Sequence, residues 1–277
     1  MGTDRELPRE IIDYYERGRE RDRLSSGAGL LEFLRTQQIL RRALPAPPAK
    51  LLDVGGASGV HAVWLAREGY DVHLLDPVPL HVEQARNAAA AQPEHSFTAD
   101  VADARRLPVA DASVDVALLL GPLYHLVERD ERLATLAEAR RVLRPGGLLA
   151  AAAIGRFGDW LYGLHAELLD DRDFQEMAIK STQTGQHRSV EGHWFTTAYY
   201  HRPEELNEEC RDAGFDVAQV VAVEGVGPLL PDLDDRLADE RRRRQLLDAL
   251  AFTESEESML GVTSHLLALA RKAEEKE

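Results

Sequence analysis

The hydrophobic positions of the chain form short runs that are separated by longer amphipathic segments. Four apolar runs have the length of strands buried on both faces, and they lie at residues 50–54, 72–75, 114–120 and 148–154. Residues 95–99 form a weaker strand. Apolar side chains recur at helical spacing in between, at residues 60–68, 79–91 and 130–143. Strands that alternate with helices predict a parallel, doubly wound sheet in an α/β fold.

This rhythm changes on both sides of the alternating region. Residues 1–44 have helical spacing with a break at 25–29, and the prolines at 45–48 end the second helix. Residues 155–203 carry many aromatic and histidine side chains without a strand–helix unit, so we interpret them as an insertion. The α/β pattern then resumes with a helix at 203–213, a strand at 217–223, one long helix at 234–251 and a strand at 263–269.

These segments predict a division of the chain into four parts. We expect an N-terminal helical cap at residues 1–44 and the first part of a cofactor-binding core at 45–154. A substrate lid is expected at residues 155–203, and the second part of the core at 204–277.

A glycine-rich loop stands between the first predicted strand and its helix. Residues 51–59 read Leu-Leu-Asp-Val-Gly-Gly-Ala-Ser-Gly, and such small residues let a ligand approach the backbone at a helix N-terminus. Asp76 closes the second strand, 21 positions after Gly55, where a carboxylate can accept both hydroxyls of a ribose. The loop lacks two glycines of the dinucleotide fingerprint, since Ala57 and Val60 stand in their places. A tight structural turn is the alternative interpretation of the loop alone.

Three further stretches extend this pattern. Residues 100–108 follow the third strand, residues 109–115 lead into the fourth, and Leu-Arg-Pro-Gly-Gly at 143–147 precedes the fifth. In order and spacing the chain resembles the class I S-adenosylmethionine-dependent methyltransferases, most of all their ubiquinone/menaquinone-type small-molecule branch. The resemblance is strong over residues 50–154 and looser over 204–270. It implies a Rossmann-like, seven-stranded, mostly parallel sheet whose last strand is antiparallel.

The resemblance also implies the cofactor, S-adenosyl-L-methionine, and its product, S-adenosyl-L-homocysteine. The residues expected around the methionine end are Asp53, Gly55, Ala57 and Gly59. Those expected beside the sulfonium, at the end of the fourth strand, are Leu120 and Gly121.

The nucleoside end is assigned in the same way. Asp76 would hold the ribose, and Pro77 with Val78 would pack on the adenine. Asp103 would accept from the adenine amino group, and the Ala104 N–H would complete the recognition of the base. Asp100 can replace Asp103 if the register of the loop differs.

The N-terminal segment resembles the cap that precedes the core in these small-molecule methyltransferases. In that family a Tyr and an Arg often cover the cofactor, and the planar guanidinium suits a carboxylate. Our candidates are Tyr15, Arg23 and Arg35. Ordinary helix packing and surface ion pairs are the alternative.

Methyl transfer to a hydroxyl or a carbon acid needs a base, and His serves best near pH 7. Tyr124 and His125 follow the fourth strand, at the end of the sheet where ligands of doubly wound folds bind. His125 is therefore the first candidate base, with Tyr124 beside it; the alternative is a structural histidine.

The expected lid supplies the second group of candidates. We expect His193 to act in catalysis and Trp194, Tyr199 and His201 to recognise the substrate, although these aromatic residues can equally form the core of the lid. No metal site is expected, because the histidines lack ligand spacing and Cys210 is the single cysteine.

Charge then narrows the acceptor class. Lys and Arg number 33 against 48 Asp and Glu, a formal net charge of −15, whereas nucleic-acid binding needs a cationic surface. No apolar run approaches the length of a membrane-spanning helix and no signal peptide is visible, so we expect a cytoplasmic protein. We expect this protein to be a monomer or a homodimer.

Together these observations predict an enzyme that methylates a small organic acceptor, with no nucleic-acid or membrane partner. Two alternatives stay open. One is a methyltransferase acting on RNA or protein, and the other is a protein that binds S-adenosylmethionine without methyl transfer, such as a cyclase.

Overall fold

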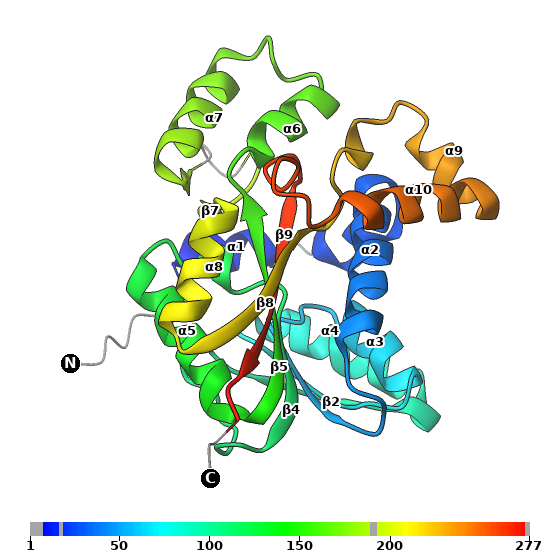
Figure 1. The fold of residues 1–277 in the computed structure, drawn as a ribbon, viewed down its shortest axis with the longest axis vertical. Coiled ribbons are helices and arrows are strands. Elements are labelled where there is room, and N and C mark those ends of the chain that lie inside the picture. Colours follow the sequence, from blue (N-terminus) through cyan, green and yellow to red (C-terminus); the bar gives the residue numbers. More distant parts are fainter. Residues whose placement is uncertain (1–7, 17–18, 189–192, 275–277) are drawn as a thin grey trace.

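The centre of the computed structural model is a twisted sheet with helices on both faces, and the structure describes residues 8–16, 19–188 and 193–274 (Figure 1). Its seven main strands run in the order β3-β2-β1-β4-β5-β9-β8. The strands are β1 (Lys50–Val54), β2 (Asp71–Asp76), β3 (Thr98–Val101), β4 (Val114–Leu119), β5 (Leu143–Gly155), β8 (Phe215–Ala222) and β9 (His265–Lys272). β9 is antiparallel to both β5 and β8, while the pairs from β3 to β5 are parallel. The predicted α/β fold, with its antiparallel last strand, is confirmed.

The continuous apolar run of β4 is explained by burial on both faces. Val116 and Leu118 pack into one hydrophobic cluster, and Ala117 and Leu119 pack into the other, because successive side chains of a strand point to opposite faces. The first cluster is covered by α2 (Gly27–Ala43), α3 (Val60–Arg67) and α4 (Pro79–Ala90). The second is covered by α5 (Arg129–Val142) and α8 (Pro203–Asp212).

Most of the other helices and strands lie around the carboxyl-terminal edge of the parallel strands, from the middle of Figure 1 to its top. They are α1 (Arg9–Tyr15), α6 (Gly158–His165), α7 (Arg172–Thr184), β6 (Gln186–His187), β7 (Ala198–His201), α9 (Leu233–Ala238) and α10 (Glu240–Thr253). β7 joins the end of β5 in parallel, through Ile154 and Gly155. Within this region the buried Asp159 carboxylate accepts from Ser181, His187 and Tyr200, which ties α6, α7, β6 and β7 together.

Several predicted boundaries differ from the structure, among them the start of β5, which lies at Leu143 and not at residue 148. The single helix expected at 234–251 is wrong: the chain forms α9 and α10, and Asp239 between them caps α10 by accepting the Arg242 N–H at 2.8 Å. The strand expected at 95–99 begins later, at Thr98. In the part of the chain that the structure describes, no helix is long and apolar enough to cross a membrane.

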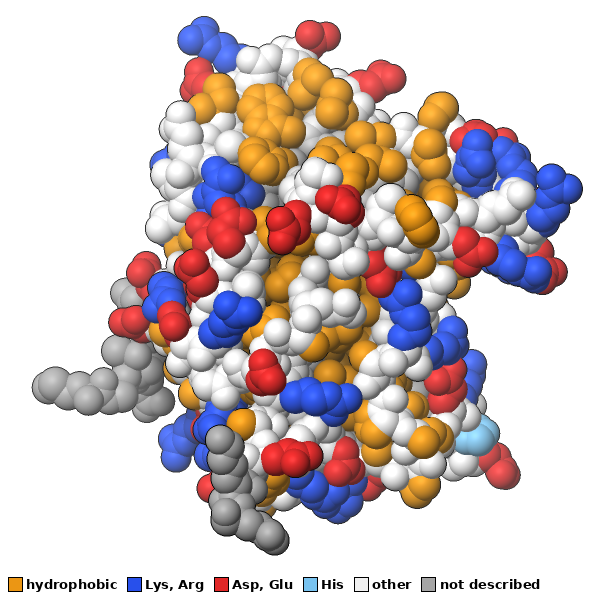
Figure 2. Space-filling model, in the orientation of Figure 1, with side chains coloured by type: hydrophobic (Ala, Val, Ile, Leu, Met, Phe, Trp, Pro, Cys, Tyr) orange, Lys and Arg blue, Asp and Glu red, His pale blue; other side chains and the backbone are white. Residues whose placement is uncertain are grey.

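The face of the molecule in Figure 2 shows Lys and Arg side chains interspersed with Asp and Glu. Hydrophobic side chains gather at its top, over α6 and α7, where Tyr162, Leu164 and Ile179 are exposed. Arg241–Arg244 lie on α10, where Arg242 and Arg244 pair with the carboxylates of Asp232 and Glu240. These ion pairs make this part of α10 a salt-bridged face rather than a basic binding surface.

Candidate functional site

One pocket runs along the carboxyl-terminal edge of the sheet, from the end of β3 to the start of β9. It collects most of the residues that the sequence nominated. Those that line it are Tyr15, Arg23, Asp53, Gly55, Ala57, Asp76, Pro77, Asp103, Ala104, Leu120, Gly121, Tyr124 and His125.

The glycine-rich loop forms the floor of the pocket beside β1. Gly55 has a φ of 72°, and a Cβ built there would lie 2.9 Å from Pro122 Cδ, so only glycine fits without movement. Ala57 also has a positive φ, 48°, which is uncommon for a residue with a side chain. Gly59, with a φ of 88°, caps the start of α3 and faces Phe97 rather than the pocket. It shapes the loop without touching the space inside.

Asp76 fastens this loop to the start of α4. Its carboxylate accepts the Ala57 N–H at 3.0 Å and the Val78 N–H at 2.9 Å, and it lies 3.1 Å from His81 Nδ1. Two carboxylate oxygens offer about four acceptor positions, so capacity for a further donor is left. The same side chain can therefore shape the loop and bind a ligand hydroxyl.

Asp53 is the most unusual acid of the pocket. It is fully buried, and both of its carboxylate oxygens lack a hydrogen-bond partner among the described residues. Burial, together with the nearby charge of Asp76, raises its pKa from 3.8 to about 7. A buried carboxylate without a partner is a costly arrangement, and a bound cation would relieve it. S-adenosylmethionine carries an ammonium and a sulfonium, so the site fits the implied cofactor.

At the adenine end the structure decides between the two acids. Asp103 lines the pocket, and its carboxylate accepts from the Arg105 backbone N–H and guanidinium at 2.6–3.2 Å. Although burial opposes it, Arg105 holds the pKa of Asp103 below its usual value. Asp100 lies outside the pocket, half exposed, and pairs with His73 and Arg86. The geometry therefore favours Asp103.

His125 and Tyr15 meet above the end of β4. His125 closes a short 3₁₀ turn after this strand, and its Nε2 lies 2.6 Å from the Tyr15 hydroxyl. Burial lowers the pKa of His125 to about 4, against opposing effects of the Thr197 backbone and the Asp76 charge. The ring is therefore neutral at pH 7, and Nε2 can accept the Tyr15 proton. Tyr124 packs edge-on against the same ring, with centroids 4.6 Å apart.

The N-terminal candidates separate into two groups. Tyr15 and Arg23 line the pocket, and Arg23 donates to both carboxylate oxygens of Glu32 at 2.5 and 2.9 Å. The structure places Arg35 differently from the prediction. Its guanidinium is fully buried outside the pocket and donates to the Glu254 carboxylate and the Val223 carbonyl. These two bonds make Arg35 a structural residue that connects α2 to the segments that follow β8 and α10.

The lid candidates do not line the pocket. His193 is exposed, and Trp194 packs edge-on against Phe174 with centroids 5.4 Å apart. Tyr199 lies against the Arg132 guanidinium, 3.8 Å from its ring centre, and His201 is fully buried beside Glu209.

Arg132 joins these last two residues by donating three hydrogen bonds to the Glu209 carboxylate. Tyr199 and His201 thus belong to a buried ionic network behind β7. Among the described residues of the insertion, Phe195 and the Thr197 backbone lie next to His125, and the ring centre of Phe195 is 5.8 Å from that of His125.

Sequence reasoning missed several residues of the pocket with acidic or imidazole side chains, which are Glu32, His61, His81 and His265. Glu32 pairs with Arg23 and lies 3.7 Å from His265 Nδ1, and Arg23 and His265 lower its pKa to about 2 despite burial. His265 could have been found from the strand order. An antiparallel last strand starts at the edge of the sheet where the parallel strands end, so its first residue reaches the pocket.

Comparison with known proteins supports the resemblance. Residues 51–147 match the family model described as a methyltransferase domain. The chain is 37% identical over 121 residues to the methyltransferase GfsG of Streptomyces halstedii, covering 43% of this chain and 42% of that protein. It is 33% identical over 153 residues to the ubiquinone/menaquinone biosynthesis C-methyltransferase UbiE of Acidiphilium cryptum, covering 50% and 60%. The matches thus span about half the length of these curated relatives.

Two further comparisons extend over more of the chain. The S-adenosyl-L-methionine-dependent Diels-Alderase iccD of Talaromyces variabilis is 29% identical over 199 residues, or 70% of this chain and 65% of that protein. The crystal structure of the [4+2]-cyclase SpnF matches with a TM-score of 0.57 at 20% identity, over 88% of this chain and 81% of that one. The resemblance to class I S-adenosylmethionine-dependent methyltransferases, predicted from the motifs, is confirmed.

Proposed function

We propose, for a chain whose residues 51–147 match a methyltransferase domain, that the pocket transfers a methyl group from S-adenosylmethionine to a small organic acceptor. The observation that carries the proposal is the single pocket lined by Asp53, Asp76 and Asp103 at the ends of neighbouring strands. Ligands of doubly wound sheets bind at this edge. The acidic composition favours a small acceptor over RNA.

Each end of the cofactor has residues of matching chemistry in this proposal. Asp103 and Ala104 recognise the adenine, Asp76 accepts from the ribose, and Asp53 balances the positive charge of the methionine end. When bound, S-adenosylmethionine supplies a methyl group already activated by the sulfonium. The protein then has to position the acceptor, exclude water and receive a proton.

His125 receives that proton in our proposal. Its neutral Nε2 accepts from Tyr15, so the acceptor proton can pass to Nε2 directly once the Tyr15 hydroxyl turns away, or through that hydroxyl. A base with a pKa of about 4 is unprotonated at neutral pH but weak. The reaction therefore favours acceptors whose O–H or C–H is already acidic, such as phenols, enols and 1,3-dicarbonyl compounds.

The segments around the pocket have a closing role in this proposal. Residues 1–44 contribute Tyr15 and Arg23 to its wall, and residues 155–203 contribute Phe195 beside His125. We assign His193 and Trp194 to lid positions that approach the acceptor, and Tyr199 and His201 to support of that lid through the Glu209 network.

The test uses S-adenosylmethionine with a trideuterated methyl group and a microbial metabolite extract. We expect S-adenosylhomocysteine to form together with an acceptor whose mass rises by the labelled methyl group, and His125→Gln to slow both. The matched control is His73→Gln, because His73 lies in the middle of β2, does not line the pocket and pairs with Asp100. Equal loss of activity in both variants, or no labelled product with any acceptor, contradicts the proposal.

A second candidate is a cyclase that binds S-adenosylmethionine without consuming it. The names of iccD and SpnF favour this alternative, since both are described as catalysing cycloadditions. A cyclase gives a product isomeric with its substrate and no S-adenosylhomocysteine. The labelled experiment therefore separates the two activities.

A further inference from the structure

The pocket continues past the residues assigned to the adenosine and the sulfonium of the cofactor. Asp103, Asp76 and Gly55 follow β3, β2 and β1, so an adenosyl-methionine ligand extends along the edge toward β4. The next strands are β5 and β9, and His265 begins β9 two strands beyond β4, about 10 Å further along the edge. The pocket wall there includes His265, close to Glu32 and its partner Arg23, so this end lies beside the methionine end of the cofactor and offers a place for the acceptor.

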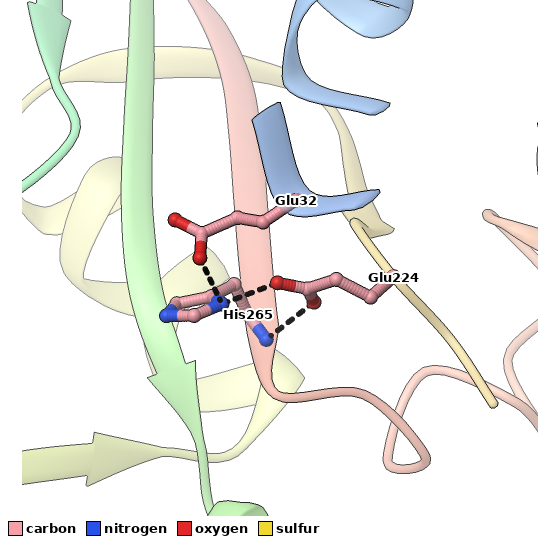
Figure 3. A group of neighbouring side chains, drawn as sticks. All are labelled: Glu32, Glu224 and His265. Carbon is pink, nitrogen blue, oxygen red and sulfur yellow. Dashed lines mark hydrogen bonds and ion pairs between the residues drawn. The ribbon is translucent and has the colours of Figure 1, made fainter. Parts of the chain in front are cut away.

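His265 is held rigidly at this end by two carboxylates (Figure 3). Its Nδ1 lies 2.5 Å from Glu224 Oε1 and 3.7 Å from Glu32 Oε2, and its backbone N–H donates to Glu224 Oε2 at 3.0 Å. The Thr263 hydroxyl adds a 3.1 Å bond to the same Glu224 oxygen. Since carboxylates only accept hydrogen bonds, Nδ1 must carry a proton.

The other ring nitrogen points away from both carboxylates (Figure 3). Among the residues that the structure describes, none forms a hydrogen bond with Nε2, and the side chain keeps 21% of its surface exposed although Glu224 keeps only 2%. Against the effect of burial, the charges of Glu32 and Glu224 raise the pKa of His265 to about 9. The ring is therefore an imidazolium at neutral pH, and Nε2–H is a donor.

Two of the histidines that line the pocket thus have opposite protonation. His125, near the sulfonium end, is neutral and can accept a proton, whereas His265 is cationic, with Nδ1–H bound to Glu224 and Nε2–H left as a donor. Environments that separate two pKa values in one site commonly mark separate roles.

We propose that the Nε2–H of His265 binds an anionic oxygen of the acceptor, a carboxylate, enolate or phenolate, at the β5–β9 end of the pocket. This inference names the acceptor chemistry and rests on the proposed methyl transfer for calling the occupant an acceptor. It makes His265 a specificity-determining residue, with Glu224 and Glu32 as the residues that position it. An acceptor oxygen that is already ionised also suits the weak base at His125.

The same three side chains are close enough to surround a metal ion, since their ligand atoms lie within 4.8 Å of one another. Their bonding argues for the imidazolium instead. Glu32 is already held by two Arg23 donors, and Glu224 accepts from Thr263 and from both the ring and the backbone of His265. With Arg23, the group is electrically neutral without any ion.

The test compares three probes of one shape on the full chain, namely 2-naphthoate, 2-naphthamide and 2-naphthylmethylammonium. Dissociation constants are measured by calorimetry with and without saturating S-adenosylhomocysteine. We expect naphthoate to bind about tenfold tighter than the ammonium probe, as a charge-assisted hydrogen bond requires. His265→Gln should remove that preference, and His73→Gln should leave it within about twofold.

The pH dependence gives an independent check. Naphthoate binding should weaken as pH rises through about 9, while naphthamide binding changes less. The charged or titratable groups that face His265 are Glu32 on α2, Glu224 after β8, Arg23 in the 3₁₀ turn before α2, and His61 at the start of α3 through its neighbour Glu32.

If His265→Gln does not fold, nitrogen-15 spectra of the wild-type imidazoles decide: naphthoate should shift the His265 signals and leave those of His73 unchanged. Undetectable naphthoate binding, equal binding of the three probes, tighter binding of the ammonium probe, or a His265 response to Zn²⁺ but not to naphthoate overturns the proposal. Absence of S-adenosylhomocysteine binding counts instead against the proposed function, because the probe order is also measured without it.

Discussion

Replacing Asp53 with Asn should stabilise the ligand-free protein in a way that depends on pH. In the folded state burial and Asp76 raise the pKa of Asp53 from 3.8 to about 7, so the folded protein holds this proton where the unfolded chain has lost it. The higher proton affinity of Asp53 in the folded state contributes fully to the stability of the wild-type protein below pH 4. This contribution is lost as pH rises to about 7. That difference corresponds to about 4 kcal/mol of unfolding free energy.

The assay is urea unfolding of both proteins between pH 4 and pH 8. The unfolding free energy of Asp53→Asn, relative to wild type, should grow by about 4 kcal/mol across this range and level off above pH 7. Asp100→Asn is the matched control, because Asp100 is half exposed and its bond to His73 lowers its pKa. The unfolding free energy of this variant, relative to wild type, should therefore change with pH in the opposite direction and by a smaller amount. If the unfolding free energies of wild type and Asp53→Asn change equally with pH, the reasoning is refuted.

Three further changes probe the loop, the hydroxyl beside the base and the buried network. Gly55→Ala should weaken S-adenosylhomocysteine binding about tenfold or more in calorimetry, because the loop would have to move; Gly69→Ala, at another positive φ outside the pocket, should lower stability without that loss. Tyr15→Phe keeps the ring but removes the hydroxyl 2.6 Å from the base, so kcat should fall about tenfold while S-adenosylhomocysteine affinity stays within about twofold. Glu209→Gln leaves the buried Arg132 without its charge partner and should cost about 3 kcal/mol in urea unfolding, with cofactor affinity unchanged.

The parts of the fold that could be predicted are those that depend on residues close together in the sequence. β1 and β4 are apolar on both faces because helices cover both sides, and that pattern is visible in any short window of sequence. The break between α9 and α10 could not be seen, because Asp239 stands within a run of acids and its capping role depends on its own backbone conformation.

The candidate site divides in the same way. Asp76 and His125 follow strands, so strand direction alone brings them to one edge of the sheet. Arg35 was assigned to the pocket because its segment resembles the N-terminal cap of the family, but its partner Glu254 lies 219 positions away. His265 was missed because its place depends on the antiparallel course of the last strand. Pairings between distant segments thus decide which polar side chains face the pocket.

The central claim is that this pocket holds S-adenosylmethionine, and calorimetry with S-adenosylhomocysteine tests it most directly. We predict one molecule bound per chain with a dissociation constant on the order of micromolar, weakened at least tenfold by Asp76→Ala. No heat of binding to the folded full chain, or an affinity that Asp76→Ala leaves unchanged, would contradict the account.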